Sequence, residues 1–437
     1  VYAPAIELGA SPASIVMNMP LPISGWRGSN GQDSWPRNYG GSSYAGPETL
    51  RKALVNSHNT AAAQALMTLV GVDNSVAFLH AMGIDDAHID ATPFGLSLGS
   101  SGITPMQMAV AFGVLANGGV YQQPISVLGI SDSTGKVIWD GHQQQERHRV
   151  FSESTAYMVV DMLKQAVSSG TGTNAKIKGQ TVAGKTGTVN ESGGGNRDVW
   201  MAAYTPELST AVWMGYDEPD AAHRLPNRVS GGTNPASLAR NFLRAWYTGR
   251  KKPDFTKPKG IVSADIDKKA IEWRGEPMLA TSLTPSVYRL NEVFLDGTQP
   301  KKKSDVWNAP ASAKSFSVSH SDDGQPLLVI QASDAAVYRV QRDAAGESFI
   351  LTELRAAAGE TLYYTDNRAQ PGVTYTYRVI PVHAELLDNG ILLEGTQSVQ
   401  VARVEKPSAL SRWFSGLFAP KPEEKEEEEL PASIFAP

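Results

Sequence analysis

A six-residue string, Ala-Gly-Lys-Thr-Gly-Thr at Ala183–Thr188, constrains the fold of this chain more than any other feature of its sequence. Read together with Gly179, it satisfies the phosphate-binding pattern G-x-x-x-x-G-K-[ST]. A phosphate loop has to lie between a buried strand and the N-terminus of a helix. Here the loop-forming residues 169–174 precede the pattern, and the glycine-rich residues 190–197, which cannot open a helix, follow it. The context therefore argues against nucleotide binding.

The same string fits a β-strand better. Residues 180–189 predict one strand, and residues 198–204 and 208–216 predict two more. The first two are separated by a glycine-rich loop, and the last two by a Thr-Pro-Glu turn. Because the connections are so short, the three strands are expected to form an antiparallel meander.

The alternation of a strand sorts the side chains of this string onto two faces. Lys185 and Gly187 should face one side, and Thr186 and Thr188 the other. In a cleft at the edge of a sheet, an ammonium group and nearby hydroxyls can bind a substrate carboxylate. Gly187 would let a substrate backbone approach closely, and the backbone N–H near Thr188 can donate to an oxyanion. The string therefore predicts a substrate-binding strand.

A second candidate is the S-x-N motif Ser57-His58-Asn59. By itself it is weak, because one such match is expected by chance in a chain of this length. We predict that it falls at a break between two helices, one over 47–56 with Pro47 as its first residue and one over 60–70. A purely structural interpretation makes Asn59 the N-cap of the second helix and gives Ser57 no role. We expect His58 to be a residue at the solvent edge.

Together the two motifs resemble the transpeptidase domain of a class A penicillin-binding protein, an enzyme that builds peptidoglycan. The resemblance covers the chain from Val1 to about residue 250. It implies a penicillin-binding-protein/β-lactamase-like α/β (α+β) fold in which helices flank an antiparallel sheet. Further matching segments are residues 35–39, 44–47, 50–54, 96–99, 102–109, 117–119, 170–172 and 212–217.

The resemblance also implies roles for the residues of the two motifs. Ser57 and Asn59 would relay protons and position the substrate amide. Lys185 would polarise the Ser57 region and, with Thr186 and Thr188, hold the substrate carboxylate, while Gly187 leaves room for the substrate. The three catalytic candidates are therefore Ser57, Asn59 and Lys185, and the substrate-binding candidates are Thr186, Gly187 and Thr188.

The family's first motif, S-x-x-K, supplies the acylated serine, and it does not precede Ser57 in this sequence. The string Ser133-Thr134-Gly135-Lys136 has the right letters but is predicted to be a hairpin turn, where serine and lysine do not share a helical face. Residues 1–7 resemble the segment that continues directly after the family's motif. The nucleophile is therefore expected upstream of Val1, with a glycan-polymerising domain and a membrane anchor further upstream.

Composition sets limits on function. The net charge is −5 without a dense basic patch, which argues against nucleic acid as a partner. The chain has no cysteine, and its eight histidines are scattered without metal-ligand spacing. The expected chemistry requires no metal or organic cofactor. No apolar stretch approaches the length of a membrane span.

The sequence predicts four parts. Residues 1–250 are the expected transpeptidase domain, and residues 251–305, which begin with a Lys- and Pro-rich stretch, the expected linker. Residues 306–405 contain short alternating strands and resemble an all-β fibronectin type III-like sandwich, in which Tyr375 would make a corner hydrogen bond. Residues 406–437 include a run of glutamates and are expected to be disordered.

By this resemblance, the chain belongs to a D,D-transpeptidase that forms an acyl-serine intermediate with peptidoglycan stem peptides, the same serine being the target of β-lactam antibiotics. Its expected place is the extracytoplasmic face of a bacterial cell membrane. Two alternatives remain open. One is an acyl-serine D,D-carboxypeptidase or β-lactamase, and the other is a non-catalytic wall-binding or sensor protein.

Overall fold

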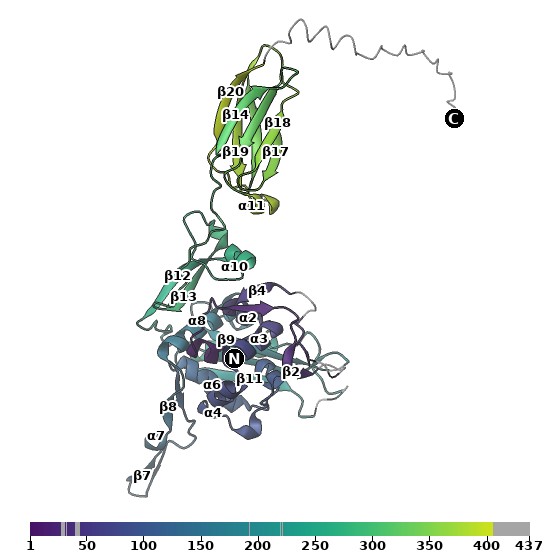
Figure 1. Cartoon of the computed structure of the whole chain (residues 1–437). Coiled ribbons are helices and arrows are strands. Elements are labelled where there is room, and N and C mark those ends of the chain that lie inside the picture. The colour runs from purple at the N-terminus through teal and green to yellow at the C-terminus, as the bar shows by residue number, and fades with distance from the viewer. Residues whose placement is uncertain are drawn as a thin grey trace, which may run out of the picture. The chain divides into compact units, whose positions relative to one another are not determined.

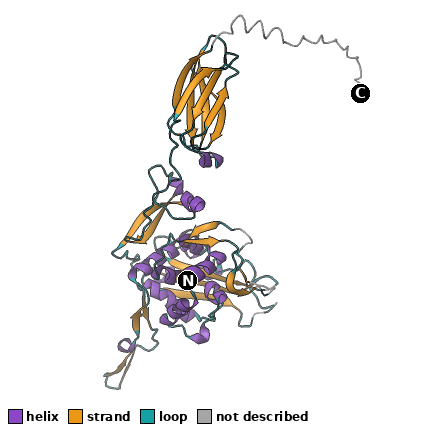
Figure 2. Ribbon diagram, in the orientation of Figure 1, coloured by secondary structure: helices purple, strands orange, loops and turns teal. Residues whose placement is uncertain are grey.

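The computed structural model describes residues 1–27, 31, 33–39, 44–191, 193–218, 220 and 222–404. The chain forms two compact units, Val1–Val306 and Trp307–Pro437. Helices surround a small sheet in the first unit, and strands dominate the second (Figures 1 and 2). The tail that the sequence predicts to be disordered, 406–437, lies outside the described residues.

The centre of the first unit is a three-stranded antiparallel sheet with the strand order β11-β10-β9. The strands are β9 (Ala183–Asn190), β10 (Asn196–Tyr204) and β11 (Ser209–Gly215). In the register of β9 and β10, Lys185 lies opposite Ala202. The predicted meander is confirmed. The order also makes β9 an edge strand in the described part of the chain, so that one of its edges is free of a neighbouring strand.

Helices cover both faces of this sheet. The two faces are buried against different clusters because successive residues of a strand point to opposite sides. On one face, α8 (Glu153–Ser168) buries Met158, Val159, Met162 and Leu163 in the same core as Ala183 and Tyr204. On the other, α9 (Asn234–Trp246) buries Ala236, Ala239 and Leu243 with Val182, Met201 and Ala203. Helix α8 begins after its N-cap Ser152, whose hydroxyl accepts a hydrogen bond from the N–H of Thr155.

Two helix boundaries predicted around the S-x-N motif are wrong. Pro47 lies in β4 (Gly46–Thr49), which pairs with β1 (Ile15–Asn18). Helix α2 (Leu50–Asn56) begins after Thr49, whose hydroxyl accepts a hydrogen bond from the N–H of Lys52. Extended pairing therefore replaces the expected first turn. In α3 (Asn59–Ala65), His58 is the N-cap and Asn59 is the first helical residue, so the predicted capping role of Asn59 is wrong.

The remaining elements of the first unit surround this centre. A π-helical turn (Leu66–Val70) continues α3 and ends at Gly71, as predicted, because φ is 84° there. The other helices are α1 (Tyr2–Glu7), α4 (Val72–Ala81), the 3-10 turn Asp86–His88, α5 (Pro93–Leu98), α6 (Pro105–Ala116), α7 (Gly141–Gln144) and the 3-10 turn Thr173–Ala175. The other strands form three antiparallel pairs, Ile23–Arg27 (β2) with Asp33–Ser34 (β3), Val120–Gln122 (β5) with Arg147–Arg149 (β8), and Gly129–Ser131 (β6) with Val137–Asp140 (β7).

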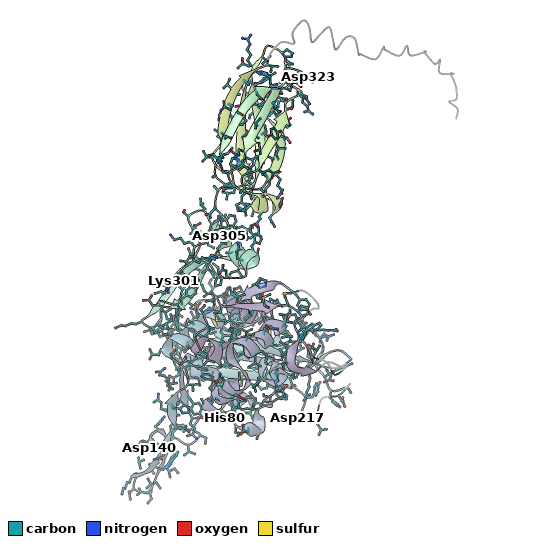
Figure 3. All side chains as sticks on the ribbon, in the orientation of Figure 1. His80, Asp140, Asp217, Lys301, Asp305 and Asp323 are labelled. Carbon is teal, nitrogen blue, oxygen red and sulfur yellow. The ribbon has the colours of Figure 1, made fainter. Side chains whose placement is uncertain are left out.

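The string Ser133–Lys136 lies in the turn between β6 and β7, as predicted from its glycine. The carboxylate of Asp132 accepts hydrogen bonds from the backbone N–H groups of Thr134 and Lys136, which closes the turn. This hairpin projects from the unit, with Asp140 near its base (Figure 3). Among the described helices, none is by itself long and apolar enough to cross a membrane, whereas residues 59–70 and 72–81 together meet the length and composition criteria but are bent by 91°.

The prediction that residues 251–305 form a linker is wrong from residue 261 onward, because residues 261–305 fold as part of the first unit. Strand β12 (Ile261–Asp267) pairs with β13 (Arg289–Leu295), and helix α10 (Lys268–Arg274) lies between them in sequence. A short 3-10 turn (Ser286–Tyr288) precedes β13. Ile266 and Phe294 are fully buried. Local sequence patterns do not predict this small core, because Ala13, far away in the sequence, is part of it.

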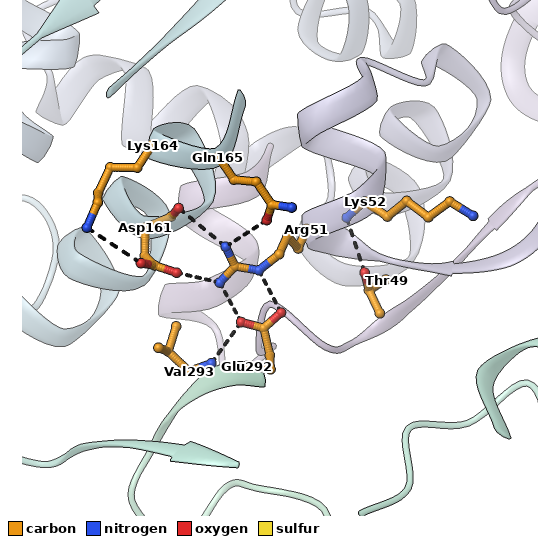
Figure 4. Close-up of polar contacts among 8 residues, drawn as sticks. All are labelled: Thr49, Arg51, Lys52, Asp161, Lys164, Gln165, Glu292 and Val293. Carbon is orange, nitrogen blue, oxygen red and sulfur yellow. Dashed lines mark hydrogen bonds and ion pairs between the residues drawn. The ribbon is translucent and has the colours of Figure 1, made fainter. Parts of the chain in front are cut away.

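A buried charge cluster ties β13 to α2 and α8 (Figure 4). The Arg51 guanidinium donates to both carboxylate oxygens of Glu292, at 2.7 and 2.5 Å, and to the carboxylate of Asp161 at 2.6 Å. The side chain of Arg51 is 7 % exposed and that of Glu292 is fully buried. A two-pronged contact of this kind satisfies the planar guanidinium. It fixes the helix that leads into Ser57.

The second unit consists of two antiparallel sheets around one core. One sheet has the order β14-β15-β18 and the other β17-β16-β19-β20. The predicted corner is confirmed, since the N–H of Gln370 donates to the hydroxyl of Tyr375 at 3.1 Å. The elements are β14 (Ser315–His320), β15 (Pro326–Gln331), β16 (Ala336–Ala344), β17 (Glu347–Ala356), β18 (Thr361–Thr365), β19 (Thr374–Val382), α11 (Ala384–Asp388) and β20 (Ser398–Arg403).

Candidate active site

The two motifs meet in space although 128 residues separate them in the chain. The Nζ atom of Lys185, on β9, donates to the Oγ atom of Ser57 at 2.8 Å and to the backbone oxygen of Thr186 at 3.1 Å. Burial lowers the pKa of Lys185 to about 8, because the charged form loses hydration. An ammonium has three N–H groups, so one remains for a ligand.

Both motifs line one cavity of about 400 Å³. All the candidates from the sequence lie on its wall, namely Ser57, Asn59, Lys185, Thr186, Gly187 and Thr188. Apolar side chains also line the cavity, including Leu54, Leu96, Phe112, Leu115 and Leu163. A mostly apolar cleft with a few convergent polar groups is the usual form of a small-molecule site.

The hydroxyl of each of the two threonines has a hydrogen-bond partner outside β9. The hydroxyls of Thr186 and Thr171 lie 2.8 Å apart. The hydroxyl of Thr188 accepts a hydrogen bond from the N–H of Gly231 at 3.0 Å. Thr171 and Gly231 were not among the candidates from the sequence. The turn at 170–172 was noticed in the sequence, but only the fold brings it beside β9.

Gly187 lies where the strand has little room for a side chain. A Cβ atom at this position would lie 3.2 Å from the Cβ atom of Trp200 on the neighbouring strand β10. The absence of a side chain also leaves the backbone of β9 open to the cavity. This agrees with the expectation that a substrate backbone approaches here.

Asn59 and His58 have partners that the sequence did not predict. The amide nitrogen of Asn59 donates to the backbone oxygen of Arg37 at 2.7 Å. The ring of His58 is 23 % exposed, and its Nδ1 atom lies 2.6 Å from a carboxylate oxygen of the buried Glu48. His58 is therefore a tethered residue rather than a free one at the solvent edge. In the described part of the chain, no three acidic or histidine side chains converge in a way that could hold a metal ion.

Comparison with protein families identifies this arrangement. Residues 22–244 match the family described as the penicillin binding protein transpeptidase domain. The chain belongs to this family. Residues 257–309 match the C-terminal domain of penicillin-binding protein 1A, which agrees with the folded segment found in place of the expected linker. The resemblance to class A penicillin-binding proteins is thereby confirmed, as is the predicted fold of the transpeptidase domain.

Curated relatives are similar over part of their length. The chain is 38 % identical over 236 residues to penicillin-binding protein 1F of Bacillus subtilis, covering 52 % of this chain and 31 % of that protein. It is 30 % identical over 327 residues to penicillin-binding protein 1A/1B of the same organism, covering 70 % of this chain and 34 % of that protein. The chain therefore spans about a third of the length of these relatives.

Solved structures show the same fold. Penicillin-binding protein 1A from Haemophilus influenzae matches with a TM-score of 0.56 and 25 % identity, over 69 % of this chain and 47 % of that chain. The PonA1 protein of Mycobacterium tuberculosis, in complex with penicillin V, matches with a TM-score of 0.50 and 25 % identity, over 59 % of this chain and 70 % of that chain.

Proposed function

We propose that this chain is the transpeptidase part of a longer class A penicillin-binding protein that cross-links peptidoglycan stem peptides ending in D-Ala-D-Ala. The observation that carries the proposal is the contact between Lys185 and Ser57 on the wall of a cavity that the Thr186–Thr188 segment also lines. Such an enzyme would work where peptidoglycan lies, at the extracytoplasmic face of the membrane, held by a segment of the longer protein.

The reaction has two steps. In the first, a serine oxygen attacks the carbonyl carbon between the two D-Ala residues, the serine proton leaves, and the amide bond breaks as the terminal D-Ala takes up a proton. In the second, an amine of a neighbouring strand attacks the ester and frees the serine. Ser57 would pass the proton between the nucleophile and the leaving amine. A β-lactam stops after the first step, because its ring opens without releasing a leaving group.

Lys185 would stabilise charge at both ends of this site. In its protonated form it donates to Ser57, which orients that hydroxyl, and its third N–H can bind the substrate carboxylate. Backbone N–H groups on the free edge of β9 can donate to the developing oxyanion. Asn59, anchored through Arg37, would face the substrate amide.

The nucleophile is proposed to be a serine of an S-x-x-K motif that precedes Val1 in the longer protein. Val1, Tyr2 and Ala3 line the same cavity as Ser57 and Lys185, and α1 begins at Tyr2. If the helix extends backwards, each added turn advances about 5.4 Å along this wall. A serine and a lysine three residues apart would then share one face of the helix.

Acylation by benzylpenicillin tests the proposal. The full-length protein should gain one penicilloyl group by intact mass, and peptide mapping should place it on a serine upstream of Val1. Incubation with a stem pentapeptide and a D-amino acid acceptor should then yield an exchanged product. Hydrolysis without exchange would instead identify a carboxypeptidase. Failure of the folded protein to form any adduct would refute the acyl-serine mechanism.

The pH dependence of acylation should report the protonation state of Lys185. Because its pKa is about 8 and the proposed role needs the protonated form, the second-order rate constant should fall about tenfold between pH 7 and 9. The Lys185→Arg variant, which stays charged, should lack this fall. A rate that rises through pH 8 would contradict the role and identify a neutral amine acting as a base.

The same pKa has a consequence for stability. Lys185 in the unfolded chain has a pKa of 10.5, so between pH 8 and 10.5 the unfolded state binds more protons than the folded state. The free energy of unfolding should therefore gain a contribution from Lys185 as the pH rises through this window. Comparison of urea unfolding of the parent chain and the Lys185→Met variant at pH 7.5 and 9.5 measures it.

A further inference from the structure

The turn that carries Ser57 has a backbone conformation that serine rarely adopts. Ser57 has φ 58° and ψ 46°, in the left-handed region, and among the described residues the only other non-glycine with positive φ is Ala345. This conformation is unfavourable for an L-residue, because its Cβ atom comes too close to the following carbonyl oxygen. It persists only where surrounding contacts fix it. In this case it places the Ser57 hydroxyl against Lys185.

The residues that follow Ser57 are held by segments outside the two helices that meet there. Asn59 is tied to the backbone of Arg37, and His58 is tied to the side chain of Glu48. The Asn59 contact belongs to a motif residue of the family. The His58 contact involves the middle position of S-x-N, which the family pattern leaves free.

Glu48 gives the second tie its strength. It lies on β4, is 1 % exposed, and its Oε2 atom has no hydrogen-bond partner in the described part of the chain, with the nearest cation, Lys52, 3.8 Å away. A buried carboxylate is costly unless it accepts hydrogen bonds, and the short contact of Oε1 with His58 supplies one. Asn18 Nδ2 lies 3.0 Å from the same ring nitrogen, which can make only one of these two bonds at a time. The bond to the carboxylate is the stronger.

We propose that His58 and Glu48 are positioning residues for the acylation reaction, an inference that rests on the function proposed above. The Nδ1–H group of His58 donates to Glu48 and pins the residue after Ser57 to β4. This contact keeps the turn in its left-handed conformation and holds the Ser57 hydroxyl 2.8 Å from Lys185. Glu48 is buried away from the cavity, and His58, although it lines the cavity, is proposed to act through Ser57 rather than by binding the substrate. The loss of the tie should therefore slow the chemical step without weakening non-covalent binding.

Two variants of the full-length protein test this, and their new side chains have nearly the same shape as each other. In His58→Asn the amide nitrogen can replace the Nδ1–H donor, whereas the leucine in His58→Leu has no donor. Stopped-flow measurement of benzylpenicillin acylation separates the dissociation constant of the first complex from the limiting acylation rate. We expect His58→Leu to lower the limiting rate about 10- to 100-fold with an unchanged dissociation constant, the size of effect that a displacement near 1 Å produces. His58→Asn should keep most of the parent rate.

The second partner provides an independent measurement. Glu48→Val removes the buried charge and the acceptor together, so it should fold even if His58→Leu does not. It should show the same loss of limiting rate, and the double variant Glu48→Val/His58→Leu should lose no more than either single one, because both break one contact. His142→Ala, on the exposed surface of α7, is the matched control and should acylate at the parent rate.

The outcomes separate this inference from the function on which it rests. If the parent protein is not acylated, the proposed function fails. If the parent is acylated and Glu48→Val or His58→Leu keeps its limiting rate, the positioning role is overturned and the function stands. Equal losses in His58→Asn and His58→Leu would also overturn it, since the donor would then not matter.

Discussion

The Lys185→Ala variant is expected to lose most of its reactivity toward benzylpenicillin, with an acylation rate lower by about 10²- to 10³-fold, the range found when one buried donor is removed from a transition-state site. Lys185 is the cation that contacts both Ser57 and the backbone of β9 inside the cavity. Its removal takes away the partner of the Ser57 hydroxyl and the charge proposed to bind the substrate carboxylate.

The control for this prediction is Lys178→Ala, because Lys178 is exposed and precedes β9 in the same segment of the chain. The measurement is quenched-flow intact mass of the full-length protein, together with thermal unfolding to establish that both variants are folded. A folded Lys185→Ala protein that is acylated at the parent rate would remove Lys185 from the mechanism.

The Arg51→Met variant is expected to lower the free energy of unfolding by about 3–5 kcal/mol, as found when one partner of a buried ion pair is removed. Glu292 is fully buried, and the side chain of Arg51 supplies two of its hydrogen bonds. Methionine can fill much of the same space but leaves the Glu292 carboxylate without a cation. The loss should therefore reflect an uncompensated buried charge rather than a cavity.

The matched control is Lys302→Met, which breaks the ion pair with Glu276 in the same part of the chain. Both side chains of that pair are about half exposed, and an exposed pair contributes less than about 1 kcal/mol. Urea unfolding followed by tryptophan fluorescence measures both variants. Similar small losses in the two would show that the buried cluster in Figure 4 does not stabilise the unit.

Local patterns were enough to predict much of the fold. The three strands of the sheet follow from their β-formers and from the glycine-rich break between the first two, since these signals depend on neighbouring residues. The boundary at Pro47 failed because pairing with β1, a partner about thirty residues away, overrides the local preference for a helix start. The prediction for the segment after residue 260 failed for a similar reason, because the small core of β12, β13 and α10 also contains Ala13, which lies far away in the sequence.

For the candidate site, too, the sequence predicted some features and not others. The sequence motifs name the residues that the structure places on one cavity, although their catalytic roles remain predictions. The partners of those residues were beyond prediction. Nothing local indicates that Thr171 would face Thr186, or that Glu48 would bind His58.

The sequence alone determined which chemistry the chain can carry, because the residue types and spacing of Lys185-Thr-Gly-Thr and Ser57-His-Asn are written locally. Only the tertiary structure decided how that chemistry is positioned. The contact of Lys185 with Ser57 joins residues 128 apart, and that of Arg51 with Glu292 joins residues 241 apart. Such pairs form because burial of the apolar faces of helices and sheet brings the elements together, and the buried charges must then find partners where the packing has placed them.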